Sequence, residues 1–232
     1  MTVLANDRLG QLFRVPEKTW TVINKRVGEA AAAAEVTGYI EQYIPEFPLL
    51  INVCEIWKNH THDSLLLQSE GITLYARDAA EGFGGLLDTM QTMDISSDKF
   101  PDDIAQRAWG LLKALDESTD RVSKSILGIE AQVSDFLAVN EEIDRQIARY
   151  KDKLGLSWES FGNIIPEMNL AVGEMSRGWW NLSQQLGELT PDRSLLWLQK
   201  PDIETALICW ENLELDAAYF RGVAKTQKFY DE

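Results

Sequence analysis

The stretch that decides the fold runs from residue 101 to residue 154 and reads PDDIAQRAWGLLKALDESTDRVSKSILGIEAQVSDFLAVNEEIDRQIARYKDKL. Along it, apolar or small residues recur at steps of three and four, which is the spacing of one face of an α-helix. We predict one unbroken helix over 101–154, roughly 80 Å long at 1.5 Å per residue. One extra step of four between Val122 and Ile126 predicts a local change in the phase of this stripe. The stripe comprises Ala108, Leu111, Leu115, Ser118, Val122, Ile126, Ile129, Val133, Phe136, Asn140, Ile143, Ile147, Tyr150 and Leu154.

A helix of that length does not fit inside a compact globule of 232 residues, so it favours an elongated bundle. Prolines at wide intervals mark the starts of further helices, because proline is best tolerated in the first helical turn. No stretch alternates apolar and polar residues for long enough to predict a strand. We predict a single all-α domain over 1–232, an elongated up-and-down bundle of four to five long helices with coiled-coil-like packing. The expected main helices are 16–44, 46–83, 101–154, 158–190 and 201–230, with a mobile connection over 84–100.

The composition is that of an ordinary soluble globular protein, with 45% hydrophobic and 25% charged residues. The net charge of −15 argues against a nucleic-acid partner and against adsorption to anionic lipid by charge alone. The first residues, MTVLANDRLGQLF, lack the basic and apolar regions of a secretory signal, and no window approaches the ~18 continuous apolar residues of a membrane-spanning helix. We therefore expect cytoplasmic residence or release by a non-classical route.

No catalytic constellation is apparent in the sequence. Gly-x-Ser-x-Gly, Walker loops and dinucleotide-binding glycine fingerprints are missing. The two histidines, His60 and His62, precede Asp63, and such a cluster can ligate a metal on a strand or loop. On the helix expected here, residues two apart point roughly 200° apart, so ordinary histidines are the favoured interpretation. We expect a non-enzyme with no catalytic residue, metal, cofactor or small-molecule substrate; a metal protein using these three residues is the alternative.

Two tryptophans stand side by side in MSRGWWNLSQQL, residues 175–186. Trp179 falls on the apolar stripe of its predicted helix, so we expect it in the core. Trp180 lies about 100° away. It either packs on a third helix or faces outward and marks a contact surface, because aromatic side chains are enriched at interfaces. Cys54 and Cys209 lie in apolar helical patterns, which indicates two buried thiols or one bridge between helices.

Three parts of the chain together resemble a family of α-helical pore-forming toxins. The resemblance is to the A component of xenorhabdolysin-type binary toxins and the related haemolysin BL group, over roughly residues 40–230. It rests on the order and pattern of the helices. The segments that carry it are IPEFPLLINVCEIWKNHTHDSLLLQSEGITLYARDAA, then DFLAVNEEIDRQIARYKDKLG, and then the pair IIPEMNLAVGEMSRGWWNLSQQLGEL and LQKPDIETALICWENLELDAAYFRGVA.

The resemblance implies a tail bundle without the family's usual head. In that family an apolar membrane-inserting element interrupts the chain between the long helix and the return helix. Here only KDKLGLSWESFGNII lies between Tyr150 and Pro166, which leaves no room for a hairpin that crosses a bilayer of roughly 30 Å. The apolar residues at this tip either cap the bundle, or they form a shallow membrane anchor or a docking point for a second component. The tryptophan among them favours the headgroup region of a membrane, which supports the anchor. With the off-stripe tryptophan, the candidate contact residues are Leu154, Leu156, Trp158, Phe161 and Trp180.

Two functional hypotheses follow from these observations. The first is a toxin-like bundle that acts by binding a partner protein, such as a second toxin-like component, by binding a membrane surface, or by oligomerising. The second is an intracellular coiled-coil scaffold or adaptor with no membrane activity. The scaffold predicts a stable dimer through the long helix, whereas the toxin-like bundle predicts a monomer that assembles only with lipid or a partner.

Overall fold

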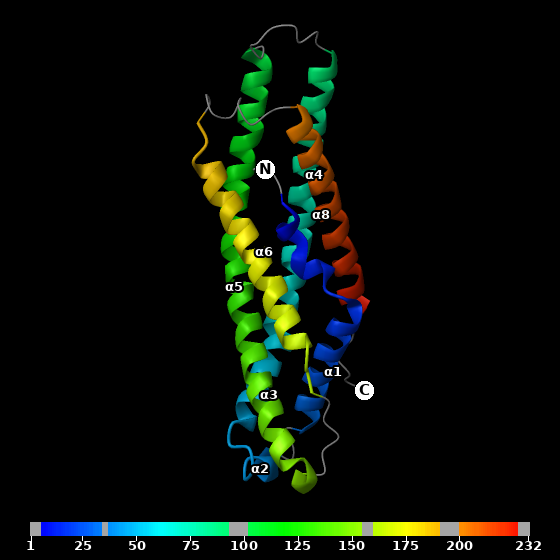
Figure 1. Ribbon diagram of the computed structural model, residues 1–232, viewed down its shortest axis with the longest axis vertical. Coiled ribbons are helices and arrows are strands. Elements are labelled where there is room, and N and C mark those ends of the chain that lie inside the picture. Colours follow the sequence, from blue (N-terminus) through cyan, green and yellow to red (C-terminus); the bar gives the residue numbers. More distant parts are fainter. Residues whose placement is uncertain (1–5, 34–36, 93–101, 155–159, 191–199, 227–232) are drawn as a thin grey trace.

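The computed structural model describes residues 6–33, 37–92, 102–154, 160–190 and 200–226. Within these ranges 92% of the residues are helical and none lies in a strand, which confirms the all-α prediction. Figure 1 shows an elongated bundle whose helices α4, α5, α6 and α8 run alternately up and down. The described chain is divided into more helical pieces than the four to five that the sequence predicts.

The long helix α5 is continuous from Asp102 to Leu154, which makes it 53 residues long and confirms the predicted rod. In the first half of α5, however, the prediction of which residues form the buried stripe is wrong. Leu112 and Thr119 are buried there, whereas the predicted Leu111 and Ser118 are only partly buried and line a groove toward α4. Counting from Leu115 through Thr119 and Val122 to Ile126, the steps are four, three and four, so no shift occurs at the predicted place.

The predicted helix 46–83 consists of three consecutive elements, α3 (Phe47–Ile56), the π-helix η3 (Trp57–Thr61) and α4 (His62–Thr92). Buried residues fall at successive steps of four from Trp57 through Thr61 to Leu65, and the wider π turn keeps them on one face. Helix α4 also continues past residue 83, so the segment 84–92, predicted as a mobile connection, is helical. Residues 93–100 of that predicted connection lie outside the described ranges.

The reason for the extension of α4 is that the core continues. Phe83, Leu86 and Met90 are all buried at helical spacing, although Gly82, Gly84 and Gly85, residues that disfavour a helix interior, stand beside them. Burial of these large apolar side chains outweighs the roughly 1 kcal/mol that each glycine costs in a helix.

The predicted first helix 16–44 is also divided. It comprises α1 (Glu17–Ala33) and the short α2 (Thr37–Ile40), with residues 34–36 outside the described ranges. An unpredicted 3-10 helix, η1 (Asp7–Arg14), precedes them and packs against both α6 and α8. Leu9, Leu12 and Phe13 of η1 are buried, so this short element completes the core where the two long helices do not meet closely.

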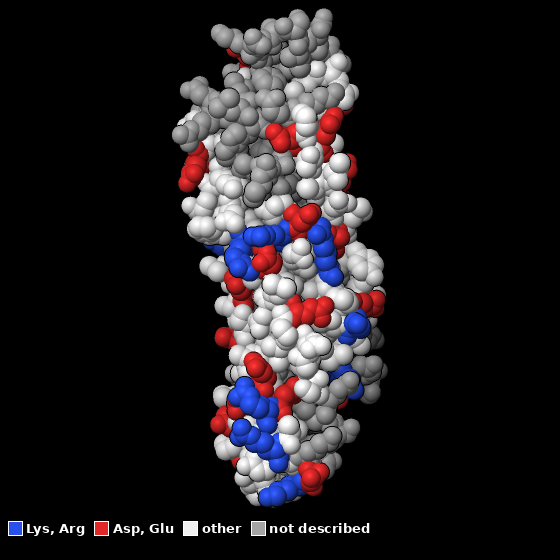
Figure 2. All heavy atoms as spheres, viewed as in Figure 1, with Lys and Arg blue, Asp and Glu red and all other residues white. Residues whose placement is uncertain are grey.

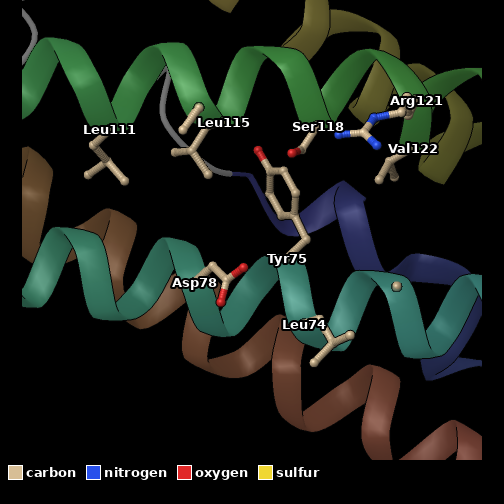
Figure 3. A pocket seen from close by; sticks show the side chains of 10 residues that line it. Leu74, Tyr75, Asp78, Leu111, Leu115, Ser118, Arg121 and Val122 are labelled. Carbon is tan, nitrogen blue, oxygen red and sulfur yellow. The ribbon is translucent and has the colours of Figure 1, made fainter.

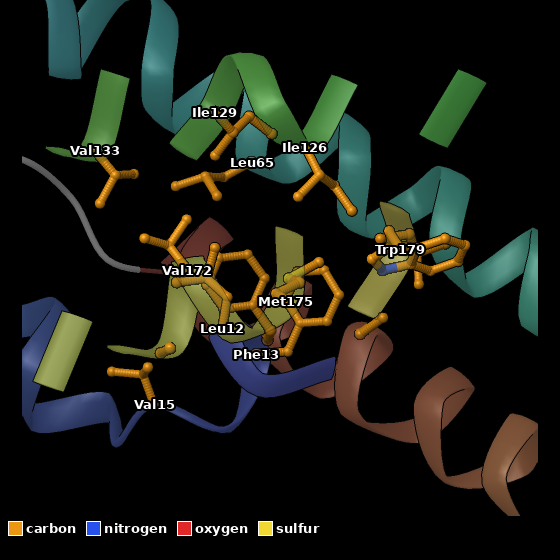
Figure 4. Packing of buried hydrophobic residues seen from close by; sticks show 14 of the residues in the cluster. Leu12, Phe13, Val15, Leu65, Ile126, Ile129, Val133, Val172, Met175 and Trp179 are labelled. Carbon is orange, nitrogen blue, oxygen red and sulfur yellow. The ribbon is translucent and has the colours of Figure 1, made fainter. Parts of the chain in front are cut away.

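Helices α6 (Ile164–Gly187) and α8 (Lys200–Thr226) complete the bundle. The start of α6 was predicted at residue 158, but residues 160–163 form a turn in which Gly162 adopts a φ of 49°. Helix α4 packs on α8 and α5, and α5 packs on α6. In the core, Val172 and Met175 of α6 lie between apolar residues of η1 and α5, as Figure 4 shows.

Candidate functional site

The adjacent tryptophans of α6 have opposite environments. Trp179 is fully buried, and its indole Nε1 donates a hydrogen bond to the carbonyl of Leu9 at 3.0 Å. Its ring also packs against Tyr75, with centroids 5.3 Å apart. The prediction that Trp179 belongs to the core is confirmed, and its hydrogen bond fixes η1 to α6.

The side chain of Trp180 is 57% exposed, so of the two predicted alternatives the structure shows the outward-facing one. Helices α5 and α6 run antiparallel, with Glu130 beside Gly173 and Asp116 beside Gly187. This register brings Leu127 of α5, also an exposed apolar residue, within about one helical turn of the level of Trp180. The two exposed side chains therefore lie at neighbouring levels of the α5–α6 pair.

An acidic depression of about 570 Å³ begins one helical turn after Trp180, which is not among its lining residues. Ser183 and Gln184, which stand three and four residues after Trp180 on the same helix, line one wall. The lining carries four carboxylates and no Lys or Arg, and one of the four, Asp120, is paired with Lys124 at 2.6 Å. Together with Trp180 and Leu127, these carboxylates define what we call the Trp180 surface; they belong to Asp116, Glu117, Asp120 and Glu188.

The described tip residues face inward. Leu154 is 9% exposed and Phe161 is 2% exposed, so neither presents its side chain to a partner or a membrane in this form. The ring of Phe161 packs on Phe136, with centroids 6.0 Å apart, and on the guanidinium of Arg26, whose Cζ lies 4.3 Å from the ring centroid. These two residues cap the bundle, while Leu156 and Trp158 lie outside the described residues.

A buried ion pair fastens this end of the molecule. Arg26 of α1 is 2% exposed and donates to the carboxylate of Asp144 at 2.9 Å and to the side-chain oxygen of Asn140 at 3.0 Å. The other oxygen of Asp144 accepts from the backbone N–H of Phe161 at 2.7 Å and from the hydroxyl of Ser160 at 3.0 Å. Burial lowers the pKa of Arg26, and the Asp144 charge opposes that shift. Three parts of the chain thus meet at one carboxylate.

The histidines do not form a metal site with Asp63. His60 is exposed, whereas His62 is largely covered and its Nδ1 lies 3.8 Å from the Asp63 carboxylate. Burial lowers the pKa of His62, which the Asp63 charge and a hydrogen bond with the backbone of Ala224 offset only in part. Across the described ranges, no group of three His, Cys, Asp or Glu side chains is placed to hold a metal ion.

The two cysteines are free thiols, so the predicted alternative of a bridge between helices does not hold. Cys54 is buried and Cys209 is half-buried. Burial raises the pKa of Cys54 to about 12, which keeps this thiol protonated and unreactive at neutral pH.

A groove of about 530 Å³ separates the outer edges of α4 and α5 (Figure 3). Its walls are mainly apolar, formed by residues such as Leu74, Leu111 and Val122, with Asp78 and Arg121 as the charged members. The Tyr75 hydroxyl lies 2.6 Å from the Thr119 hydroxyl, and burial raises the pKa of Tyr75. This arrangement joins α4 to α5 and supplies neither a nucleophile with a base nor a pair of carboxylates for acid–base chemistry.

The charges on the face seen in Figure 2 alternate in sign. Lys and Arg are interleaved with Asp and Glu there and do not gather into one basic surface. No family model matches the chain, and no curated protein matches its sequence. Within the part of the chain that the structure describes, no helix has both the length and the apolar character needed to cross a bilayer.

Proposed function

We propose that this protein is a non-enzymatic, toxin-like helical bundle, resembling a component of an α-pore-forming toxin, that acts by binding a partner protein. The observation that carries the proposal is Trp180, more than half exposed beside a depression that contains carboxylates and no basic residue. An exposed tryptophan is a frequent anchor in interfaces, where a few aromatic and Arg residues supply most of the binding energy.

The charge around Trp180 selects the kind of partner. Asp120 is already paired with Lys124. The other three carboxylates, one helical turn from the exposed indole, favour a segment rich in Lys or Arg, which pairs with the acids and stacks a cation on the ring. The same charge disfavours a surface of anionic lipid. A protein partner with a basic, amphipathic helix therefore fits this surface better than a membrane does. In this proposal, coiled-coil-like packing within a single domain gives the contact a rigid support.

The test uses a Lys/Arg-rich amphipathic helical peptide as the probe and isothermal titration calorimetry as the measurement. We expect Trp180→Ala to weaken binding of this peptide by about tenfold or more, the loss typical of an aromatic hot spot. The matched control is Leu170→Ala, which removes an exposed apolar side chain of the same helix away from the acidic depression. This control is expected to bind like the wild type.

Vesicles supply the competing outcome. Co-sedimentation with phosphatidylcholine vesicles and with vesicles containing phosphatidylserine measures association with a membrane surface. If Trp180→Ala leaves binding to the peptide unchanged, the Trp180 surface does not carry the function. If the wild type ignores the peptide and binds the vesicles, the membrane alternative replaces the partner protein.

A further inference from the structure

Helix α8 carries two apolar stripes on opposite sides. The first is buried against α4 and η1 and consists of Ile203, Ala206, Trp210, Leu213, Ala217, Phe220 and Ala224. The second faces away from the bundle, where α8 forms part of the outside of the molecule (Figure 1). Its apolar members are Ile208, Leu215 and Tyr219, whose side chains are 57%, 67% and 67% exposed. We call this second stripe the outer seam.

The outer seam has the spacing of a helix that packs on another helix. Ile208, Asn212, Leu215, Tyr219 and Gly222 follow one another at steps of four, three, four and three, the same alternation as in the buried stripe. Single exposed apolar residues are ordinary on protein surfaces. Three large ones in a repeating register on one helix form a face that no other described part of the chain covers.

The charges beside the outer seam distinguish between the partners that this face could accept. One flank carries Glu204, Glu211, Ala218 and Lys225, exposed and seven residues apart, so its first half is acidic and its end is basic. In a parallel pair each flank lies against the opposite flank of the second copy, which places Glu211 beside Asp216, a second carboxylate, and leaves Glu204 without a cation. Two antiparallel copies would place each Glu204 against the Lys225 of the other copy.

The same antiparallel register also matches the shapes of the outer seam. With the twofold axis at Leu215, this residue meets its own counterpart, and Ile208 meets the small Gly222 of the second copy. Asn212 then comes beside Tyr219 of the second copy, so the polar groups of the seam face each other. The remaining charges toward α4 are already satisfied within one chain, because Arg77 pairs with Glu214 at 2.8 Å and Arg221 pairs with Glu70 at 3.1 Å.

We propose that the outer seam of α8 is the interface of a homodimer, in which a second copy of this chain packs its own α8 antiparallel across a twofold axis near Leu215. A closed twofold arrangement uses the same surface of both copies, which is the commonest symmetry of soluble oligomers. The interface lies on a different helix from the Trp180 surface, so either proposal can fail without the other.

Sedimentation equilibrium over a range of concentrations up to about 100 μM tests the dimer directly. The wild type is expected to dimerise reversibly at physiological salt, which screens the repulsion between two acidic chains. Leu215→Glu is expected to raise the dimer dissociation constant by about tenfold or more, because it places two carboxylates at the axis. The matched control, Leu170→Glu on α6, alters a similarly exposed leucine outside both the seam and the Trp180 surface and is expected to dimerise like the wild type.

A charge exchange tests the antiparallel orientation. Lys225→Glu is expected to weaken the dimer by a few fold, since it leaves Glu204 opposite another carboxylate. Adding Glu204→Lys to that variant is expected to restore the affinity, which a parallel pair would not do. Circular dichroism melting of each variant checks that the monomer is folded. We expect each variant to fold, because substitutions at exposed positions usually change the stability little.

Three results would overturn the proposal. The first is a wild type that stays monomeric throughout the concentration range. The second is a dimer that Leu215→Glu and Leu170→Glu weaken equally. The third is a monomer that binds phosphatidylcholine vesicles and loses that binding in Leu215→Glu, because the seam would then contact lipid.

Discussion

For single residues of this bundle, the position around the helix decides whether a side chain is buried. Trp179 and Trp180 are chemically identical neighbours, and a rotation of about 100° places one in the core and the other in solvent. The stripe pattern in the sequence was sufficient to place Trp179. It could not place Trp180, because whether a third helix covers that side depends on the arrangement of the whole bundle.

The Arg26–Asp144 pair gives a prediction at this scale. Arg26→Ala should lower the free energy of unfolding by about 3–5 kcal/mol, since it leaves a buried carboxylate without its cation. Urea unfolding followed by circular dichroism measures the loss. Arg77→Ala is the control, because solvent screens its exposed pair with Glu214 and little stability depends on it. Equal losses in the two variants would show that Asp144 is not buried as described.

His62 gives a prediction about pH. Burial favours its neutral form, so its pKa in the folded protein lies below the ordinary 6.5. As the pH falls below 6.5, the unfolded chain binds a proton that folded His62 resists, and stability declines until the pH reaches the folded pKa. Urea unfolding between about pH 7.5 and about pH 5.5 measures this decline.

His62→Gln should flatten this part of the pH dependence. His60→Gln, which alters the exposed neighbour, should retain the decline of the wild type. If both variants keep the full decline, groups other than His62 cause it.

At the scale of elements, the sequence predicted what depends on local periodicity. The continuity of α5 followed from its repeated three- and four-residue steps, and the outer seam of α8 shows equally regular spacing. The errors arose where local signals competed with packing. Glycines suggested that α4 ends near residue 83, but buried Phe83, Leu86 and Met90 extend it to Thr92. Which residues are buried in the first half of α5 depends on how α4 packs against it. The periodicity of one helix alone does not show this.

The extension of α4 can be tested with glycine. Gly85 lies in α4 with open space around the position of an added Cβ. Gly85→Ala should therefore raise the free energy of unfolding by up to about 1 kcal/mol, through the higher helix propensity of alanine. Thermal or urea unfolding detects the change. A mobile connection over 84–92 would gain no helix propensity, so an unchanged stability would contradict the helix there.

At the scale of the whole molecule, the bundle depends on contacts between distant segments. Helix η1 fills the space between α6 and α8, and it could not be predicted from the sequence pattern because a short 3-10 helix has little periodicity. The Trp180 surface likewise combines α5 and α6, so its aromatic residue was identifiable in the sequence and its acidic depression was not. The described tip residues Leu154 and Phe161, predicted as contact residues, are both buried, and Arg26 and Asp144 hold Phe161 in place.

The central claim is that this molecule acts through a partner that contacts the Trp180 surface. Hydrogen-exchange mass spectrometry of the protein, alone and with the basic amphipathic peptide, tests it most directly because it locates the contact along the chain. Binding of the peptide at the Trp180 surface is expected to slow exchange within residues 116–127 of α5 and 176–187 of α6, with α1 and α3 unchanged. Protection confined to other helices, or none at saturating peptide, would contradict it.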